Sequence, residues 1–279
     1  MIGRRLFWRL SRIAYYKARR ELRSNDIGSN GEADLQRRAA AQHAKRTPGA
    51  GFVAIDVGAN LGEWTLCMLD AARGAGIRAS IHSFEPVPMV HDELLRRVAA
   101  SPDADAVRCV PKCVGSEPGT ARMNVCAGLA GSHSLVRKSE GRDHVDVIDV
   151  PVITIADYCN ENGIESIDLL KVDAEGFDFE VILGALPLLR AGKVSILQFE
   201  YNLCWIDGRH FLKDVFDLAH ELGFVVGKLL PTAIEIYPHW HAELERFIEG
   251  NYALGRREAL EAAGGVVGSF DASNTYAAD

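Results

Sequence analysis

Short runs rich in β-branched residues alternate with helix-like patterns from residue 51 onward, and this alternation constrains the fold more than any other feature. Strands are expected at 52–57, 79–84, 106–114, 167–172, 194–199, 225–230 and 252–255. Additional strands are expected around a Gly/Ser loop at 120–126 and 145–153. Helices are expected at 61–73, 87–100, 155–162, 178–185, 210–222 and 242–248. The pattern predicts an α/β fold with a mostly parallel central sheet and helices on both faces.

The two ends of the chain differ from this pattern. We expect a basic amphipathic helix, a linker and a second helix at 32–46 within residues 1–50, a main domain over 51–262, and a flexible tail over 263–279. The first 23 residues carry eight Lys or Arg and one Glu, whereas the whole chain has a net charge of −7. The remainder therefore carries −14, and so acidic a body argues against a nucleic-acid partner.

The basic segment at 1–23 has two helical faces of different character. One is apolar and the other basic: Ile2, Leu6, Leu10 and Ile13 against Arg5, Arg9, Arg12 and Arg19. Three interpretations stay open: docking on the chain's own domain, weak peripheral contact with an anionic membrane surface, and contact with a partner. The six cysteines lack C-x-x-C spacing. We expect reduced thiols in a cytoplasmic protein, with any membrane contact at the inner face.

A glycine turn follows the first expected strand in "DVGANLG". Gly58 and Gly62 permit a tight strand-to-helix turn, but the third glycine of a dinucleotide fingerprint is missing. Asp56 also places negative charge where a pyrophosphate would lie. Glu85 ends the second expected strand, where a carboxylate can accept both hydroxyls of a ribose. A zwitterionic nucleoside without phosphate fits this pattern better, and S-adenosylmethionine is such a ligand.

Five segments together resemble the FkbM-type methyltransferases. They are "FVAIDVGANLGEWT", "HSFEPVP", "GSHSL", "VPVITIADY" and "IDLLKVDAEGFDFEVILGA", and the resemblance extends over about 51–257. It implies a Rossmann-like class I methyltransferase fold and transfer of a methyl group from S-adenosylmethionine to a hydroxyl group of a sugar, glycan or polyketide-like natural product. The sequence departs from the family at Asp178, where Glu is more common, and residues 1–48 lie outside the resemblance.

The resemblance also implies the residues of a cofactor site. The methionine end would contact Gly58, Asn60, Gly62 and Thr65, the ribose would contact Glu85, and the adenine would lie near Cys113 and Val114. The expected cofactor-binding set is completed by Asp56, Ala59, Pro86 and Asp173.

An alcohol becomes a good nucleophile only when a base removes its proton, which typically contributes ~10²–10⁴-fold in rate. Asp173 and Glu175 follow the fourth core strand in "KVDAEG", so one carboxylate would hold the cofactor ammonium and the other face the acceptor. The alternative is a cluster that caps the next helix. His133 in "GSHSL" is another candidate base. Expected contacts to the small-molecule or glycan acceptor come from Ser132, His133, Ser134, Lys171, Glu200 and Asn202.

Two other function classes stay open. A nicotinamide-dependent oxidoreductase would share the fold and the ribose carboxylate, and a regulatory module would bind the cofactor without catalysis. The acidic turns are compatible with Mg²⁺, but no spacing requires a metal and we assign no ligands.

Overall fold

The computed structural model describes residues 3–18, 25–126, 135 and 144–268. Within these residues the strands of the main sheet lie in the order β12-β10-β9-β11-β8-β7-β1-β2-β3. The parallel half is formed by β1 (Phe52–Val57), β2 (Ala79–Phe84), β3 (Val107–Val110), β7 (Ile167–Val172) and β8 (Val194–Tyr201). The other half contains β9 (Val225–Leu230), β10 (Ala233–Tyr237), β11 (Gly250–Gly255) and β12 (Gly265–Val267). In the main sheet, β9 pairs antiparallel with β10 and with β11, and β11 pairs antiparallel with β8, which connects the second half to the parallel half.

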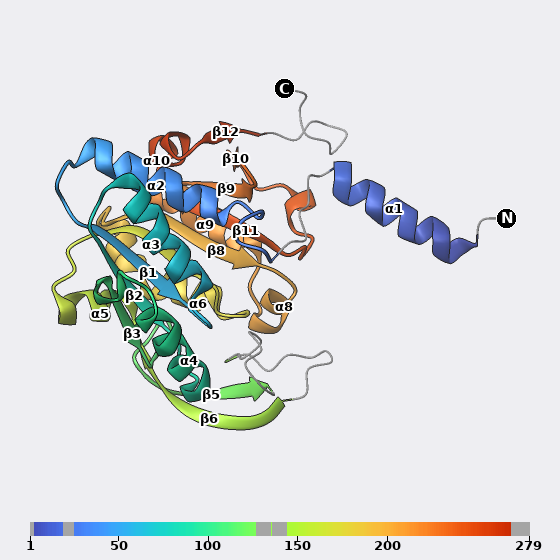
Figure 1. Ribbon diagram of the computed structural model, residues 1–279. Coiled ribbons are helices and arrows are strands. Elements are labelled where there is room, and N and C mark those ends of the chain that lie inside the picture. The colour runs from blue at the N-terminus through green and yellow to red at the C-terminus, as the bar shows by residue number, and fades with distance from the viewer. Residues whose placement is uncertain (1–2, 19–24, 127–134, 136–143, 269–279) are drawn as a thin grey trace.

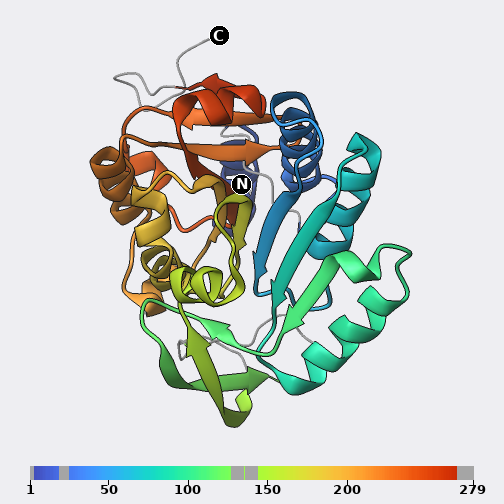
Figure 2. The same cartoon turned by 90° about the vertical axis from the view of Figure 1, so that its left-hand side faces the viewer.

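Helices cover both faces of the sheet (Figures 1 and 2). One face carries α2 (Glu32–Arg46), α3 (Glu63–Ala75), α4 (Pro88–Ala99) and α10 (Arg257–Ala262). The other carries α5 (Ile155–Asn162), α6 (Asp178–Gly184), α7 (Leu186–Arg190) and α9 (Leu212–Leu222). Successive side chains of a strand point to opposite faces, so β1 contributes Phe52 and Ala54 to one core and Ile55 and Val57 to the other. The α/β class with a mostly parallel sheet is confirmed.

A smaller sheet extends from the edge of the main one below α4 (Figure 1). It has the order β4-β6-β5 and consists of β4 (Cys113–Val114), β5 (Gly119–Cys126) and β6 (His144–Ile153). The sequence predicted one strand over 106–114, which is wrong, because β3 and β4 belong to different sheets. Pro111 stands between them and has no N–H to continue a strand ladder.

Several elements near the C-terminus differ from expectation. The helix predicted at 242–248 is only a short 3₁₀ turn, η2 (Ala242–Leu244), because Phe247 has a positive φ of 50°. The sequence analysis missed β10, α7, α8 (Cys204–Gly208), α10 and β12. The expected tail over 263–279 begins with β12, which pairs in parallel with β10.

The two N-terminal helices differ in what covers them. The predicted second helix is confirmed as α2, and its Leu35, Ala39 and Ala40 pack with Trp64 and Met68 of α3 in one core. By contrast, α1 (Arg4–Ala18) projects from the body and buries no side chain (Figure 1). Within the described residues, none of the helices combines the length and the apolar character needed to cross a bilayer.

Candidate active site

The turn between β1 and α3 is shaped by close contact with a neighbouring strand. Gly58 has a φ of 74°, and a Cβ atom there would lie 1.9 Å from the carbonyl oxygen of Asp173 at the end of β7. The amides of Gly58 and Ala59 donate to the carbonyl of Phe84, at 3.1 and 2.9 Å. Gly62 also has a positive φ, and a Cβ there would contact Leu94 at 2.6 Å. Close contact with backbone therefore requires glycine at position 58, whereas at position 62 the positive φ of 82° is what favours glycine.

A buried polar cluster supports this turn from below. Asp56 is fully buried, and it accepts a hydrogen bond of 2.7 Å from the Thr65 hydroxyl. The Lys171 ammonium lies 3.3 Å from carboxylate oxygens of both Asp56 and Asp173 and donates to the Gly58 carbonyl at 3.1 Å. Burial by itself lowers the pKa of Lys171, but the surrounding carboxylates of Asp56 and Asp173 raise it well above its usual value. Lys171 is therefore a charged link between β1 and β7.

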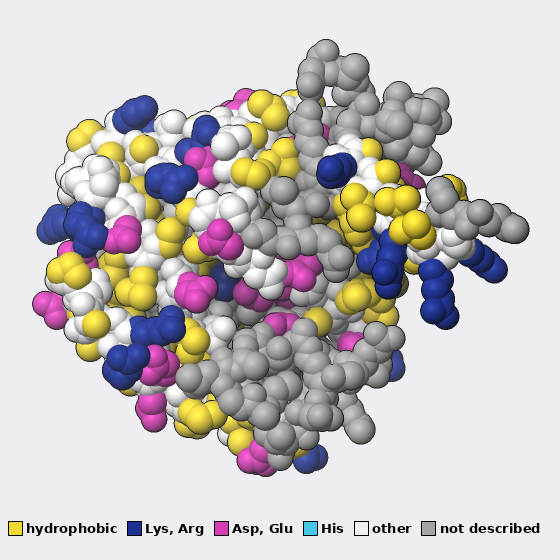
Figure 3. Space-filling view, turned by 45° about the vertical axis from the view of Figure 1, so that its right-hand side comes forward, with side chains coloured by type: hydrophobic (Ala, Val, Ile, Leu, Met, Phe, Trp, Pro, Cys, Tyr) yellow, Lys and Arg dark blue, Asp and Glu magenta, His cyan; other side chains and the backbone are white. Residues whose placement is uncertain are grey.

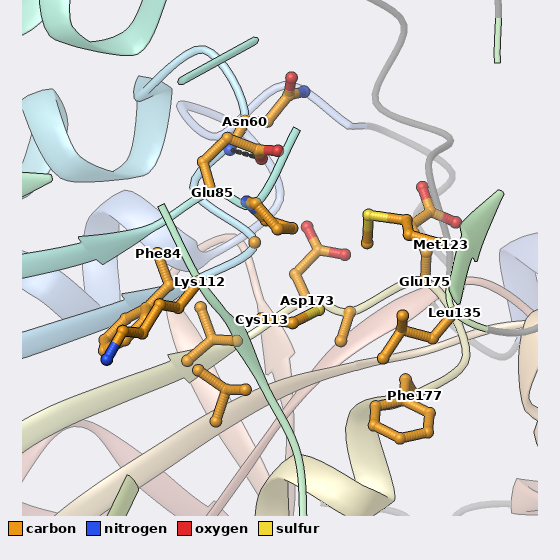
Figure 4. A pocket seen from close by; sticks show the side chains of 15 residues that line it. Asn60, Phe84, Glu85, Lys112, Cys113, Met123, Leu135, Asp173, Glu175 and Phe177 are labelled. Carbon is orange, nitrogen blue, oxygen red and sulfur yellow. Dashed lines mark hydrogen bonds between the residues drawn. The ribbon is translucent and has the colours of Figure 1, made fainter. Parts of the chain in front are cut away.

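A pocket opens beyond the carboxyl ends of β1, β2 and β7 and is closed by the small sheet (Figure 4). It is lined by Val57, Gly58, Asn60, Phe84, Glu85, Pro86, Lys112, Cys113, Val114, Met123, Leu135, Asp173, Ala174, Glu175 and Phe177. We call it the first pocket. It lies where an open α/β sheet ordinarily binds its ligand.

Glu85 lies at the polar end of the first pocket, where two backbone amides hold its carboxylate. Its two carboxylate oxygens accept hydrogen bonds from the amides of Asn60 and Val87, both at 3.0 Å. Burial raises the pKa of Glu85 to about 7, although these two amides oppose the shift. Since a carboxylate has about four acceptor positions, capacity remains for the hydroxyls of a ligand. Figure 4 shows the Asn60–Glu85 bond facing the pocket.

The other end of the first pocket is largely apolar. Phe84, Val114, Met123, Leu135 and Phe177 contribute aliphatic and aromatic surface to it. Cys113 lies among them, and burial raises the pKa of its thiol to about 12, so the thiol is neutral at pH 7. These surfaces suit a flat, uncharged ring.

The turn after β7 separates a structural carboxylate from two that face the cavity. Asp178 accepts hydrogen bonds from the amides of Ala174 and Gly176, both at 2.9 Å, and burial raises its pKa to about 7. The residue that departs from the family pattern is thus the one that holds the turn. Asp173 and Glu175 instead line the pocket, and Glu175 adopts a positive φ of 53°. The alternative that these two carboxylates cap the next helix stays open.

A second, polar cavity adjoins the first pocket and shares Gly58, Asn60, Asp173 and Glu175 with it. Its further lining residues are Asn25, Ile27, Asn30, Glu32, Ala59, Leu61, Glu63, Trp64, Lys171, Glu200, Lys228, Leu229, Glu249, Gly250 and Asn251. We call it the second cavity. Burial raises the pKa of Glu200 well above its usual value, and the carboxylates of Asp173 and Glu175 raise it further.

The structure brings together most of the residues predicted for the site. Between them, the first pocket and the second cavity contain Gly58, Ala59, Asn60, Glu85, Pro86, Cys113, Val114, Lys171, Asp173, Glu175 and Glu200. Four predicted residues line neither: Asp56, Gly62 and Thr65 support the turn from behind, and Asn202 donates to Glu200 and caps the Cys204 amide at 2.8 Å. Ser132, His133 and Ser134 lie outside the described residues.

Sequence reasoning missed the apolar walls and part of the second cavity. Phe84 and Phe177 adjoin recognised motifs in "FEP" and "EGF", so their position was a usable signal. Lys228 was another, because it is a charged residue within an apolar run and is buried in β9. Glu32 carried no local signal at all.

The residues present fit S-adenosylmethionine. The side-chain oxygen of Asn60 is buried and has no hydrogen-bond partner among the described residues, so it is available to an ammonium or hydroxyl donor. Glu85 suits ribose hydroxyls, and the apolar end suits adenine. The described residues contain no group of three or more His, Cys, Asp or Glu side chains arranged to hold a metal ion, so the Mg²⁺ option receives no support.

The chain is similar to one curated protein and to several solved structures. The curated methyltransferase sdnD of Sordaria araneosa is 29% identical over 156 residues, which is 47% of this chain and 59% of that protein. The chain thus matches about three fifths of the length of this relative. Among solved structures, the methyltransferase FkbM from Methylobacillus flagellatus is 15% identical with a TM-score of 0.45, covering 77% of this chain and 47% of its own. Cofactor-bound Rv0187 from MTB is 14% identical with a TM-score of 0.45, covering 89% and 88%.

The family assignment rests on the domain match. The methyltransferase FkbM domain matches residues 56–226, which run from the aspartate before the glycine turn to the start of β9. This stretch contains every residue of the first pocket. The chain therefore belongs to the FkbM methyltransferase family.

Proposed function

We propose that this protein transfers the methyl group of S-adenosylmethionine to a hydroxyl oxygen of a small-molecule or glycan acceptor, with sugars and polyketide-like compounds as the expected classes. The observation that carries the proposal is the junction of the two cavities. Asp173 and Glu175 line both the first pocket, which fits the cofactor, and the second cavity, which is large and polar. A methyl donor on one side would thus meet an acceptor on the other.

The chain's own residues would orient the cofactor by three contacts. Glu85 would accept the ribose hydroxyls, the Asn60 side-chain oxygen and the Asp173 carboxylate would hold the ammonium, and Phe84 and Phe177 would flank the adenine. When bound, S-adenosylmethionine supplies an electrophilic methyl group on a sulfonium, which is a good leaving group. The protein's main task is then alignment, for which effective molarities of about 10⁵–10⁸ M are known.

A carboxylate at the junction would activate the acceptor. As the hydroxyl oxygen gains the methyl group it must lose its proton, and Asp173 or Glu175 would accept that proton. Lys171, 3.3 Å from Asp173, would hold the Asp173 carboxylate in place. The products would be a methyl ether, S-adenosylhomocysteine and one proton.

Ligand binding distinguishes the proposed function from two alternatives, a nicotinamide-dependent oxidoreductase and a regulatory module that binds the cofactor without catalysis. Titration calorimetry should show S-adenosylhomocysteine binding at micromolar or better affinity and no comparable NADH binding. Tight NADH binding without S-adenosylhomocysteine binding would support the oxidoreductase. Cofactor binding without turnover on any hydroxyl acceptor would support the regulatory module.

We further propose that α1 binds an anionic membrane surface weakly. Its apolar side chains Leu6, Phe7, Trp8, Leu10 and Ile13 are each at least half exposed, so the described body leaves this face uncovered. Figure 3 shows apolar and basic side chains gathered on the projecting helix. Its contact with the body is at its end, where the Tyr15 hydroxyl donates to Glu243 at 3.1 Å. Apolar and arginine-rich faces together suit shallow insertion among anionic headgroups.

A further inference from the structure

Part of the wall of the second cavity comes from outside the matched family domain. Asn25, Ile27, Asn30 and Glu32 belong to the segment 25–32, which precedes α2 and includes its first residue. The FkbM domain match begins only at residue 56. A part of the chain for which the family provides no role thus helps to enclose the space beside Asp173.

This segment is a fixed part of the fold. A Cβ atom at Gly31 would lie 2.4 Å from the carbonyl oxygen of Leu230, so the chain passes directly against the end of β9. Behind it, the Gln36 side chain of α2 donates to the Trp64 carbonyl at 3.0 Å. With α2 packed on α3, the wall cannot leave the cavity without opening the hydrophobic core.

Glu32 is held by three carboxamides from three different segments. One carboxylate oxygen accepts from Asn30 at 2.7 Å and from Asn251 of β11 at 3.0 Å, and the other accepts from Gln198 of β8 at 2.8 Å. An ionised carboxylate has about four acceptor positions, so about one remains for a further donor. Burial raises the pKa of Glu32, and the nearby Lys171 ammonium opposes this shift.

The cavity around Glu32 is lined by more acidic than basic side chains. Carboxylates on its lining belong to Glu32, Glu63, Asp173, Glu175, Glu200 and Glu249, whereas the cationic side chains belong to Lys171 and Lys228. Like charges brought together in a partly buried site repel strongly. Such a lining favours hydrogen-bond donors without negative charge and disfavours phosphate or carboxylate groups.

We propose that the segment 25–32 is the acceptor-selecting wall of the site, and that Glu32 accepts a hydrogen bond from a hydroxyl or amine group of an acceptor without negative charge. This inference rests on the proposed methyl transfer and adds to it a residue outside the family domain. Glu32 would be a specificity-determining residue, because it lines the second cavity together with the junction residues Asp173 and Glu175.

The first part of the test identifies the charge class of the acceptor. The purified protein is incubated with S-adenosylmethionine labelled in its methyl group and with neutral, cationic and anionic fractions of an extract of small molecules and glycans. Labelled product is expected in the neutral or cationic fraction. Label confined to the anionic fraction would overturn the inference alone. No label in any fraction, with S-adenosylhomocysteine binding intact, would overturn the methyl transfer and the inference with it.

The second part tests Glu32 with the fraction that is labelled. In Glu32→Gln the concentration of that fraction at half-maximal transfer should rise at least tenfold, while the affinity for S-adenosylhomocysteine stays within twofold. Glu32→Asp should recover part of the loss, because it keeps the charge. Asp34→Asn is the matched control, since Asp34 lies in the first turn of the same helix, pairs with Arg38 at 2.6 Å and lines neither cavity.

A further variant keeps the test decisive if Glu32→Gln lowers the melting temperature. Asn25 is exposed at the rim of the second cavity, so Asn25→Trp adds bulk there without disturbing the core. It should raise the half-saturating acceptor concentration and leave cofactor affinity unchanged. Unchanged half-saturation in Asn25→Trp and in folded Glu32→Gln would overturn the assignment of this wall.

Discussion

The first pocket and the second cavity meet at Asp173 and Glu175, yet they are built in different ways. All residues of the first pocket come from 57–177, and most adjoin the ends of consecutive parallel strands. The second cavity combines the segment 25–32 with β9 and the start of β11, which are brought together only when the antiparallel half of the sheet forms. The pocket that fits the cofactor is a local property of the α/β unit, whereas the second cavity depends on distant segments.

This difference between the two cavities indicates in which of them residues can change without affecting the other. A cofactor common to a family is served by residues at strand ends, where the fold fixes their position. The second cavity contains a segment outside the domain match and part of β11, so it can vary without altering the first pocket. Substitutions in the two cavities should therefore have separable effects, and the junction should affect both.

The largest effect is expected at the junction. Asp173→Asn and Glu175→Gln should leave the fold intact, and at least one should lower turnover a hundredfold or more, because a general base contributes about 10²–10⁴-fold. The measurement is turnover at saturating S-adenosylmethionine with a hydroxyl acceptor that the wild type methylates. Glu165→Gln is the control, since Glu165 is exposed before the opposite end of β7. Near-normal turnover in both junction variants would show that neither carboxylate is the base.

The next largest effect is expected on ligand affinity in the first pocket. Glu85→Ala should weaken S-adenosylhomocysteine binding by about 1.5–3 kcal/mol, the range for hydrogen bonds to charged groups. Calorimetric titration measures the change, and a melting curve shows whether loss of the Asn60 and Val87 bonds also loosens the turn. Affinity equal to that of the wild type would remove Glu85 from the proposed ribose contact.

A smaller effect should appear on changing pH. Because the pKa of Glu85 in the free protein is about 7, the carboxylate is mostly ionised at pH 8 and mostly protonated at pH 6. Ribose hydroxyls need the ionised form as acceptor, so affinity should fall about tenfold from pH 8 to pH 6, and binding should release a proton below pH 7. Titrations in buffers of different ionisation enthalpy measure that proton. Glu85→Gln should flatten the profile, and a flat wild-type profile would contradict the prediction.

The smallest effect on either cavity is expected at α1, which lines neither of them. Arg5→Glu with Arg9→Glu should leave S-adenosylmethionine binding unchanged and release the protein from anionic vesicles. Two basic residues near such a surface add roughly 2 kcal/mol at best. Sedimentation with neutral and anionic vesicles measures the release. Equal partitioning of wild type and double variant would refute membrane contact, and a large fall in melting temperature would instead indicate docking on the body.

Helices α1 and α2 show how far an amphipathic pattern can be interpreted. Both have 15 residues and were predicted from sequence, but α2 buries Leu35 and Ala40 in the core while α1 buries nothing. A pattern of spacing identifies an apolar face and leaves open what covers it. The predicted helix at 242–248 was wrong for a related reason: the spacing of residue types does not indicate the left-handed backbone at Phe247, whose ring stacks on Tyr201.

The sequence by itself determined the α/β class, the glycine turn with Glu85 and the carboxylates of "KVDAEG", since these follow from strand periodicity and from residue types at strand ends. Only the tertiary structure decided that Asp178 holds its turn, that Asp56 and Thr65 lie beneath theirs, and that Glu32 lines the second cavity. Glu32 and Asn251 are separated by 219 positions along the chain, yet they share a hydrogen bond of 3.0 Å. Local pattern carries no information about such a contact, because it forms only when α2 packs on α3 and β11 joins the sheet.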